Sequence, residues 1–258
     1  MTASVFIDGA AGTTGLEIAD RLAGRSEFTL IALDDARRKD PAARAEALNA
    51  ADFVILCLPD DAARESVALI ENDTTRVIDA STAHRVAPGW TYGFPEVEGR
   101  RNVAQAMRVS NPGCYSTGFI ALGHKHVPEM QARCGLALPP IFTPAVIPAH
   151  RGMVVEIPLP RAAMQGAASP DELRQCLAAF YADSPVVHMG ESPADGELLL
   201  RASNQGNDRL DLFVFASSDA SQVRLIAMLD NLGKGASGAA VQSLNLMAGL
   251  EETAGLRL

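Results

Sequence analysis

The sequence predicts an α/β protein, with a doubly wound parallel sheet in its first half and a second α+β domain on a mixed sheet. Three observations carry this prediction. Short apolar runs alternate with helix-start signals through the first half, which is typical of strand–helix–strand units. The run at 51–58 (ADFVILCL) is apolar except for Asp52, as in a parallel strand covered on both faces. Beyond Gly123 strand patterns predominate, so a different sheet is expected there.

The chain opens on a strand, a glycine-rich turn and a helix. Residues 4–8 (SVFID) form the strand, and the helix carries Leu16, Ala19 and Leu22 on one face. Glycines between them allow unusual backbone angles and let a pyrophosphate approach the amides of a helix N-terminus. The spacing is GxxGxxG rather than GxGxxG, which alone is weak evidence. Its place at the first strand–helix junction favours nucleotide binding over a plain tight turn. The candidate contacts are Gly9, Gly12, Thr13, Thr14 and Gly15.

A second strand is expected at 28–33, and a dinucleotide fold places its ribose-discriminating residue directly after this strand. Two interpretations stay open from the residues alone. Asp34 or Asp35 would accept a hydrogen bond from a ribose 2′-hydroxyl, whereas Arg37 and Arg38 would hold a 2′-phosphate. Solvated charges at a helix start are the alternative for all four.

The rest of the parallel half follows the same pattern. A helix is expected from Asp60 to Ile70, a strand at 76–81, and a turn-rich link at 90–96. Thr82, His84 and Arg85 fall on the loop side of the sheet, where such folds bind ligands. Arg108 and Val109 lead into the next segment, which gives five strands in all.

The segment SNPGCYSTG at 110–118 is the strongest chemical signal. A buried strand runs into a Pro–Gly turn, and a helix begins at about Tyr115. Cys114 therefore lies at a helix N-terminus, where unpaired amides and the helix dipole favour the thiolate. The alternative is a small buried cysteine at a strand–helix corner. Polar neighbours on both sides favour the nucleophile.

The second half is expected to be richer in strands. A helix should begin at Ser169, because an N-cap is followed by Pro170 and two acidic residues. Its buried stripe would be Leu173, Leu177 and Phe180. The remaining expected elements are strands at 141–146, 153–159, 210–217 and 222–229, the last two as an antiparallel pair, and a final helix from about 231 to 250.

Composition excludes several classes of partner. The chain has 258 residues, 48% of them hydrophobic, and a formal net charge of −9, which disfavours nucleic acid and acidic membranes. No apolar stretch is long enough to span a membrane, and no targeting segment is recognised, so a cytoplasmic location is expected. Four cysteines without CxxC spacing predict reduced thiols and no structural zinc site.

Taken together, several segments resemble one family, the N-acetyl-gamma-glutamyl-phosphate reductases in their shorter bacterial form. The matching stretches are GAAGTTG (9–15), CLPDDAARE (57–65), VIDASTAHR (77–85), YGFPE (92–96), SNPGCYSTG (110–118), HKHVPEM (124–130) and LDNLGKGASGAAVQSLNLM (229–247). The resemblance implies NADPH-dependent reduction of an acyl phosphate to an aldehyde in arginine biosynthesis. It also implies a Rossmann domain of residues 1–115 and 236–258, a catalytic domain of residues 116–235, and a homodimer or homotetramer.

The resemblance also implies roles for particular residues. Cys114 would be the nucleophile and His124 the acid/base, with His126 and Glu129 lining the same site. The family's preference for NADP favours Arg37 and Arg38 over the aspartates, with Ser81 and Asn231 as further cofactor contacts. Arg85 and Arg151 are candidates for the substrate's phosphate or carboxylate, since a guanidinium pairs with either in a bidentate way. The His124–His126 pair has no further Cys or His cluster beside it, so no metal site is predicted.

The sequence departs from the family's pattern at one place. The family carries a longer stretch between the cysteine helix and the HKH motif, and here only ten positions separate Cys114 from His124. The junction falls near 119–124. Either the sequence omits disordered residues, which the intact flanks favour, or the protein is shortened and its active site is built differently. The competing functions are an aspartate-semialdehyde dehydrogenase-like reductase and a nucleotide-binding homologue without catalysis.

Overall fold

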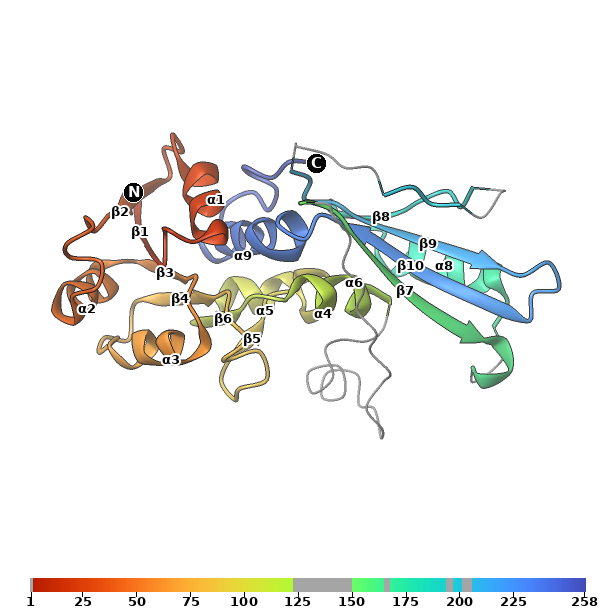
Figure 1. Cartoon of the computed structure of the whole chain (residues 1–258), viewed down its shortest axis with the longest axis horizontal. Helices are drawn as coiled ribbons and strands as arrows, with labels where there is room; N and C mark the ends of the chain where they lie inside the picture. The colour runs from red at the N-terminus through yellow and green to blue at the C-terminus, as the bar shows by residue number, and fades with distance from the viewer. Residues whose placement is uncertain (1, 123–149, 165–167, 194–196, 201–205) are drawn as a thin grey trace. The chain divides into compact units, whose positions relative to one another are not determined.

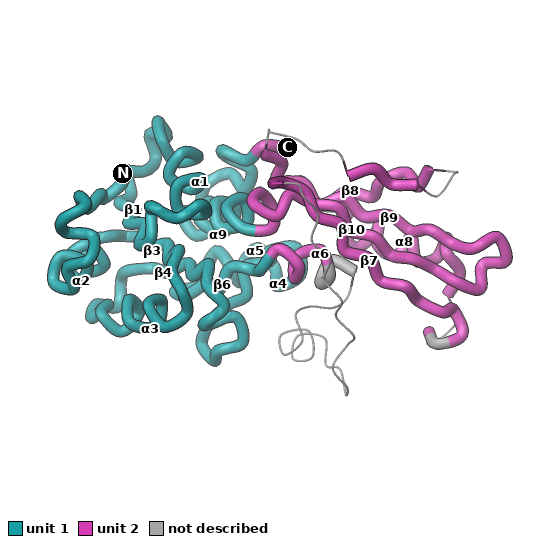
Figure 2. The backbone as a smooth tube through the Cα atoms, viewed as in Figure 1, with its two compact units in different colours: residues 1–113, 236–256 teal, residues 114–235, 257–258 magenta. Residues whose placement is uncertain are grey.

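A computed structural model gives the structure of the chain, and it describes all residues except 1, 123–149, 165–167, 194–196 and 201–205. The chain divides into two compact units, coloured separately in Figure 2. The first unit comprises residues 1–113 and 236–256, and the second comprises residues 114–235 and 257–258. Unit 1 is therefore discontinuous, because the chain leaves it before Cys114 and returns to it at Ala236.

Unit 1 is built on a six-stranded parallel sheet in the order β2-β1-β3-β4-β6-β5. This confirms the doubly wound sheet that the sequence predicts. The order changes direction between β1 and β3, which are neighbours although β2 lies between them in the chain. The strands are β1 (Ala3–Asp8), β2 (Phe28–Ile31), β3 (Phe53–Leu56), β4 (Arg76–Asp79), β5 (Thr91–Tyr92) and β6 (Arg108–Ser110).

Helices cover both faces of this sheet (Figure 1). They are α1 (Thr13–Leu22), α2 (Pro41–Ala50), α3 (Asp60–Ala68), α4 (Pro95–Glu98), α5 (Arg100–Gln105) and α9 (Gly238–Met247). Side chains alternate along β1, so Val5 and Ile7 join one core cluster with α1, α5 and α9. Phe6 points the other way and packs with α2 and α3. The last helix is thus part of the core of the first unit.

Two expectations for unit 1 are wrong in detail. The link at 90–96 contains a sixth strand, β5, which pairs with β6 through only two residues. So short a strand has no periodicity that a sequence pattern could reveal. Leu16 was expected on one face of α1 with Ala19 and Leu22, but it is 59% exposed. Leu22 is buried, and Ile18 is buried with it.

Unit 2 contains a four-stranded sheet in the order β7-β10-β9-β8. The β7–β10 and β10–β9 pairs are antiparallel and the β8–β9 pair is parallel, so the sheet is mixed, as predicted. Its elements are α6 (Cys114–Leu122), β7 (Met153–Pro160), the 3-10 turn η1 (Arg161–Ala163), α8 (Pro170–Phe180), β8 (Val187–Met189), β9 (Leu210–Ala216) and β10 (Gln222–Leu229). A π-helical turn, η3 (Gly233–Ser237), leads into α9.

Two helices cover one face of this sheet. Ser169 caps α8 through a full capping box with Glu172, as its sequence predicts. Leu173 and Leu177 pack on the sheet, but Phe180 was wrongly assigned to the same stripe and is 61% exposed. A Cβ on Gly118 of α6 would lie 2.7 Å from Val155, so α6 lies directly on β7. The short strand β8 was not expected, and the strand expected at 141–146 falls outside the described residues.

In the part of the chain that the structure describes, no helix is both long and apolar enough to cross a membrane.

Candidate functional site

Two glycines of the turn after β1, Gly9 and Gly15, leave no room for a side chain. Gly9 has a φ of +92°, and a Cβ there would lie 2.3 Å from the carbonyl oxygen of Cys57. A Cβ on Gly15 would lie 2.5 Å from the carbonyl oxygen of Gly9. Gly12 is the N-cap of α1 and supplies no side-chain cap, so the first-turn amides of Thr13 and Thr14 are not capped by it. This is the arrangement in which a helix N-terminus receives a phosphate.

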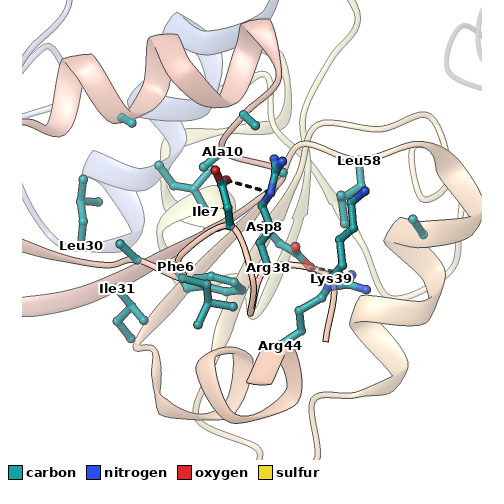
Figure 3. A pocket seen from close by; sticks show the side chains of 17 residues that line it. Phe6, Ile7, Asp8, Ala10, Leu30, Ile31, Arg38, Lys39, Arg44 and Leu58 are labelled. Carbon is teal, nitrogen blue, oxygen red and sulfur yellow. Dashed lines mark hydrogen bonds and ion pairs between the residues drawn. The ribbon is translucent and has the colours of Figure 1, made fainter. Parts of the chain in front are cut away.

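A cavity of about 570 Å³ opens beside this turn, at the carboxyl ends of β1 and β2 (Figure 3). Leu30 and Ile31 lie on one side of it, and the basic side chains of Arg38 and Lys39 lie on another. Arg38 is paired with Asp35 at 3.1 Å. An apolar wall with basic groups at one edge suits the adenosine half of a phosphorylated dinucleotide.

The four charged residues proposed as ribose or phosphate contacts after β2 make different interactions. The Asp34 carboxylate accepts hydrogen bonds from the main-chain N–H groups of Ala36 and Arg37, so it caps the local turn. Arg37 pairs with Glu46 at 3.0 Å and does not line the cavity, whereas Arg38 does. Lys39 also lines the cavity, and sequence reasoning missed it although it completes the Arg37–Lys39 basic run.

A buried ion pair supports the floor of the same cavity. Asp8, the last residue of β1, is 5% exposed and receives Arg44 at 2.8 Å and the Ser66 hydroxyl at 2.8 Å. Arg44 also donates to the Ser66 hydroxyl at 2.6 Å. These contacts tie α2 and α3 to the end of β1. The glycine cradle, the cavity and its basic edge together fit an NADP-type dinucleotide.

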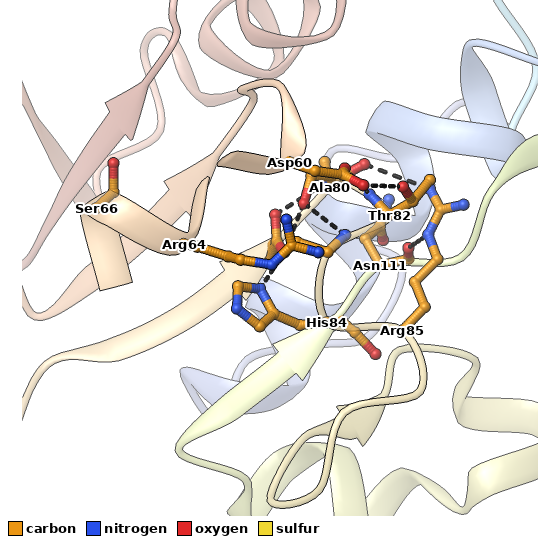
Figure 4. A network of polar contacts seen from close by, with 12 residues as sticks. Asp60, Arg64, Ser66, Ala80, Thr82, His84, Arg85 and Asn111 are labelled. Carbon is orange, nitrogen blue, oxygen red and sulfur yellow. Dashed lines mark hydrogen bonds and ion pairs between the residues drawn. The ribbon is translucent and has the colours of Figure 1, made fainter. Parts of the chain in front are cut away.

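A second polar cluster occupies the carboxyl ends of β4 and β6 (Figure 4). Asp79 is fully buried and accepts hydrogen bonds from the Ser81 N–H and hydroxyl. His84 Nδ1 lies 2.6 Å from the same carboxylate, and the His84 ring stacks on Trp90 at 4.1 Å. The Asp79 main-chain oxygen accepts the N–H of Asn111 at 2.7 Å. Ser81 and His84 thus hold the loop after β4 against the segment after β6.

Arg85 lies in this cluster and is 7% exposed. Its Nε donates to the carbonyl oxygen of Asn111 at 3.1 Å and its Nη2 to that of Ala80 at 3.4 Å (Figure 4). On the other side of the loop, Asp60 accepts from both the hydroxyl and the N–H of Thr82. The hydroxyl bond is the main cause that holds the pKa of Asp60 below its usual value. The loop is therefore fixed at both ends, with Arg85 in a set orientation.

Cys114 is the first residue of α6 and is half-buried. A Cβ added to Gly235 would lie 2.6 Å from the Cys114 Cβ, so the glycine allows this close approach. The Gly235 N–H donates to the Asp230 carbonyl oxygen at 3.0 Å, which fixes its position. Cys57 is not suited to act as a nucleophile. Burial and the nearby charges of Asp79 and Asp8 raise the pKa of its thiol to about 12.

Arg151 lies in unit 2, where it pairs with Asp230 at 2.8 Å. Both line a cavity of about 280 Å³, together with Arg209 and Asp211. Asn231 is close by, and its Oδ1 accepts the N–H of Gly152 at 3.0 Å. Arg151 is thus held at the end of β10, within the second unit.

Three candidates, His124, His126 and Glu129, lie outside the described residues, as does Cys134. Among the described residues, no group of three or more His, Cys, Asp or Glu side chains is placed to hold a metal ion.

Two family models match the chain. The family model "Semialdehyde dehydrogenase, NAD binding domain" matches residues 33–106, and "Semialdehyde dehydrogenase, dimerisation domain" matches residues 104–231. An N-acetyl-gamma-glutamyl-phosphate reductase of Trichormus variabilis is 40% identical, with 98% of each chain covered. An N-acetyl-gamma-glutamyl-phosphate reductase 2 of Pseudomonas putida is 42% identical, covering 96% of this chain and 97% of the relative.

Solved structures share the fold at low identity. An aspartate semialdehyde dehydrogenase II of Vibrio cholerae superposes with a TM-score of 0.62 at 14% identity, covering 96% of this chain and 99% of the other. The aspartate semialdehyde dehydrogenase of Francisella tularensis gives 0.63 at 11% identity, with 95% and 100% covered.

The chain is shorter than its relatives inside the aligned region. The Trichormus alignment is 317 positions long and the full sequence has 258 residues, so at least 59 aligned positions hold no residue of this chain.

Proposed function

The chain belongs to the N-acetyl-gamma-glutamyl-phosphate reductase family, and from this premise we propose that it reduces N-acetyl-glutamyl 5-phosphate to N-acetyl-glutamate 5-semialdehyde and phosphate with NADPH, in arginine biosynthesis. The observation that carries the proposal is identity of 39–42% over nearly the whole length of several reductases. The cradle at Gly9 and Gly15 and the placement of Cys114 at the start of α6 support it.

Cys114 is the nucleophile in this proposal. Its thiolate attacks the acyl carbonyl carbon, the new C–S bond forms, and the C–O bond to phosphate breaks, which leaves a thioester on the enzyme. NADPH, when bound, supplies the hydride that reduces this thioester toward the aldehyde. The main-chain N–H of Cys114 stabilises the negative oxygen that develops at the carbonyl. His124 takes the thiol proton and later protonates or deprotonates the oxygen of the reduced adduct. His126 and Glu129 are assigned to the same site.

Arg85 and Arg151 are proposed to bind the anionic groups of the substrate. The guanidinium of Arg85 is oriented by two carbonyl oxygens, and that of Arg151 by Asp230. A guanidinium fixed in this way meets a phosphate or carboxylate with little loss of side-chain entropy.

The cofactor-binding residues in the proposal are Gly9, Gly12, Thr13, Thr14 and Gly15 for the pyrophosphate, with Ser81 and Asn231 as further contacts. Arg38 would hold the 2′-phosphate, because it lines the cavity beside the glycine turn. Arg37 has the same charge but pairs with Glu46 away from the cavity, which makes it a matched control.

Arg38→Ala is therefore expected to weaken NADPH binding by about 10- to 100-fold, the value of charge-assisted hydrogen bonds to a phosphate. Its NADH affinity should hardly change. Arg37→Ala should weaken NADPH binding by less than about threefold, because it breaks only an exposed ion pair. Fluorescence titration of both variants with both cofactors measures this. Equal losses in the two variants would assign the 2′-phosphate to the whole basic run rather than to Arg38.

A homodimer or homotetramer and a cytoplasmic location complete the proposal. The match to a family dimerisation domain supports the first. The absence of disulfides among the described cysteines Cys57, Cys114 and Cys176 supports the second, because reduced thiols are typical of the cytoplasm.

The reverse reaction tests the function. With NADP⁺ and phosphate, the protein should oxidise N-acetyl-glutamate semialdehyde, and NADPH absorbance should rise only when phosphate is present. Preference for aspartate semialdehyde would instead assign the chemistry of the structural neighbours. The absence of at least 59 aligned positions favours a second candidate, a nucleotide-binding protein without catalysis. Tight NADPH binding with no turnover of either aldehyde would select that candidate.

A further inference from the structure

The side-chain oxygen of Asn111 is a buried acceptor that receives no hydrogen bond within the described part of the chain. Asn111 directly follows β6 and is 1% exposed. Its main-chain N–H donates to Asp79, its main-chain oxygen accepts from Arg85, and its Nδ2 donates to the Ala236 carbonyl oxygen at 3.0 Å. Only Oδ1 is left, and no group of the residues that the structure describes donates to it.

The orientation of this amide follows from its contacts. Rotating the amide by half a turn would place Oδ1 against the Ala236 carbonyl oxygen, and two acceptors repel each other, so Nδ2 must face Ala236. An amide oxygen that is buried and unpaired costs free energy, and native proteins rarely keep one without a reason. A donor supplied by a ligand accounts for it.

The place of Asn111 in unit 1 narrows the choice of ligand. A dinucleotide lies across the carboxyl edge of such a sheet, with its two halves on either side of the point where the strand order reverses. Here that point lies between β1 and β3, and the cavity for the adenosine half is beside β1 and β2. Asn111 follows β6, on the other half of the sheet, which receives the nicotinamide. Phosphates carry no donor at neutral pH, whereas the nicotinamide carboxamide carries an NH₂ group.

We propose that Asn111 Oδ1 accepts a hydrogen bond from the carboxamide NH₂ of the nicotinamide and so orients the ring. The inference rests on the proposed function, because it assumes an NADP-type cofactor in unit 1. Asn111 is linked through its own main chain to Asp79 and Arg85, so the same residue connects ring orientation to the loop that carries Arg85 (Figure 4).

A cofactor analogue tests the inference by binding alone. In 3-acetylpyridine adenine dinucleotide phosphate, a methyl group replaces the carboxamide NH₂ and the carbonyl is kept. Calorimetric titration of the wild type should give about five- to tenfold weaker binding of this analogue than of NADP⁺, the value of one hydrogen bond. Asn111→Ala should bind the two ligands equally. Asn111→Asp loses the same contact to Ala236 but keeps an acceptor oxygen, so it should retain the preference.

The possible results separate the two claims. Equal binding of both ligands by the wild type overturns the inference without any mutation. If Asn111→Ala still binds NADP⁺ more tightly than the analogue, the inference is overturned as well, because another group must then accept the hydrogen bond from the carboxamide NH₂. Failure of the wild type to bind either ligand overturns the proposed function and the inference together.

Discussion

Replacing Cys114 by alanine is expected to lower phosphate-dependent oxidation of N-acetyl-glutamate semialdehyde by at least about 10⁴-fold, because no thioester can form without the sulfur. NADP⁺ affinity should change little, since the glycine turn and the cavity beside it belong to the first unit. Steady-state rates and calorimetric titration of the same preparation separate the two effects.

Two other cysteines are matched controls. Cys57→Ala removes a thiol whose pKa is raised to about 12, and Cys176→Ala removes an exposed thiol on α8. Both variants should keep near-normal turnover. Iodoacetamide at pH 8 should label Cys114 fastest, and bound substrate should slow that labelling. Full turnover in Cys114→Ala, or activity lost equally in Cys57→Ala, would refute the role of Cys114.

Gly235→Ala is expected to cost about 1–3 kcal/mol in the free energy of unfolding, because the new Cβ would lie 2.6 Å from the Cys114 Cβ and one of the two must move. Turnover should fall by about 100-fold, since a displacement of about 1 Å at a nucleophile has an effect of this size. Urea denaturation and steady-state kinetics measure the two losses.

A double variant shows whether the contact is direct. Cys114→Gly removes the Cβ that Gly235→Ala would meet, so Gly235→Ala should cost clearly less stability in that background. Activity stays absent in the double variant. Additive stability losses would show that the alanine clashes mainly with the main chain, at the Cys114 Cα (3.0 Å) or the Asp230 carbonyl oxygen (3.2 Å).

Much of the fold could be predicted because its signals are local. The parallel sheet, the mixed sheet and the capping box at Ser169 each follow from runs of residues whose pattern is visible without tertiary context. Strands β5 and β8 could not be predicted, since two or three residues show no alternation and are held by pairing with longer neighbours. Leu16 and Phe180 fit a helical period, but the period does not say which neighbour covers that face.

The candidate site divides in the same way. The Cys114 turn and the glycine turn are contiguous motifs, so their residues could be proposed directly from the sequence. The choice between Arg37 and Arg38 depends on Glu46, nine positions further on, and no spacing rule identifies that partner. The unpaired oxygen of Asn111 appears only when the donors around it have been counted.

The return of α9 to the first unit has a consequence for biosynthesis. Val241, Leu244 and Met247 belong to the same apolar cluster as Val5 and Ile55, so that cluster stays unfinished while the ribosome is still making the second unit. Until α9 is made, the apolar side chains that it covers stay exposed on the amino-terminal half. Newly made chains with such exposed surfaces aggregate or bind chaperones. The second unit is nearly continuous in sequence and has no such delay.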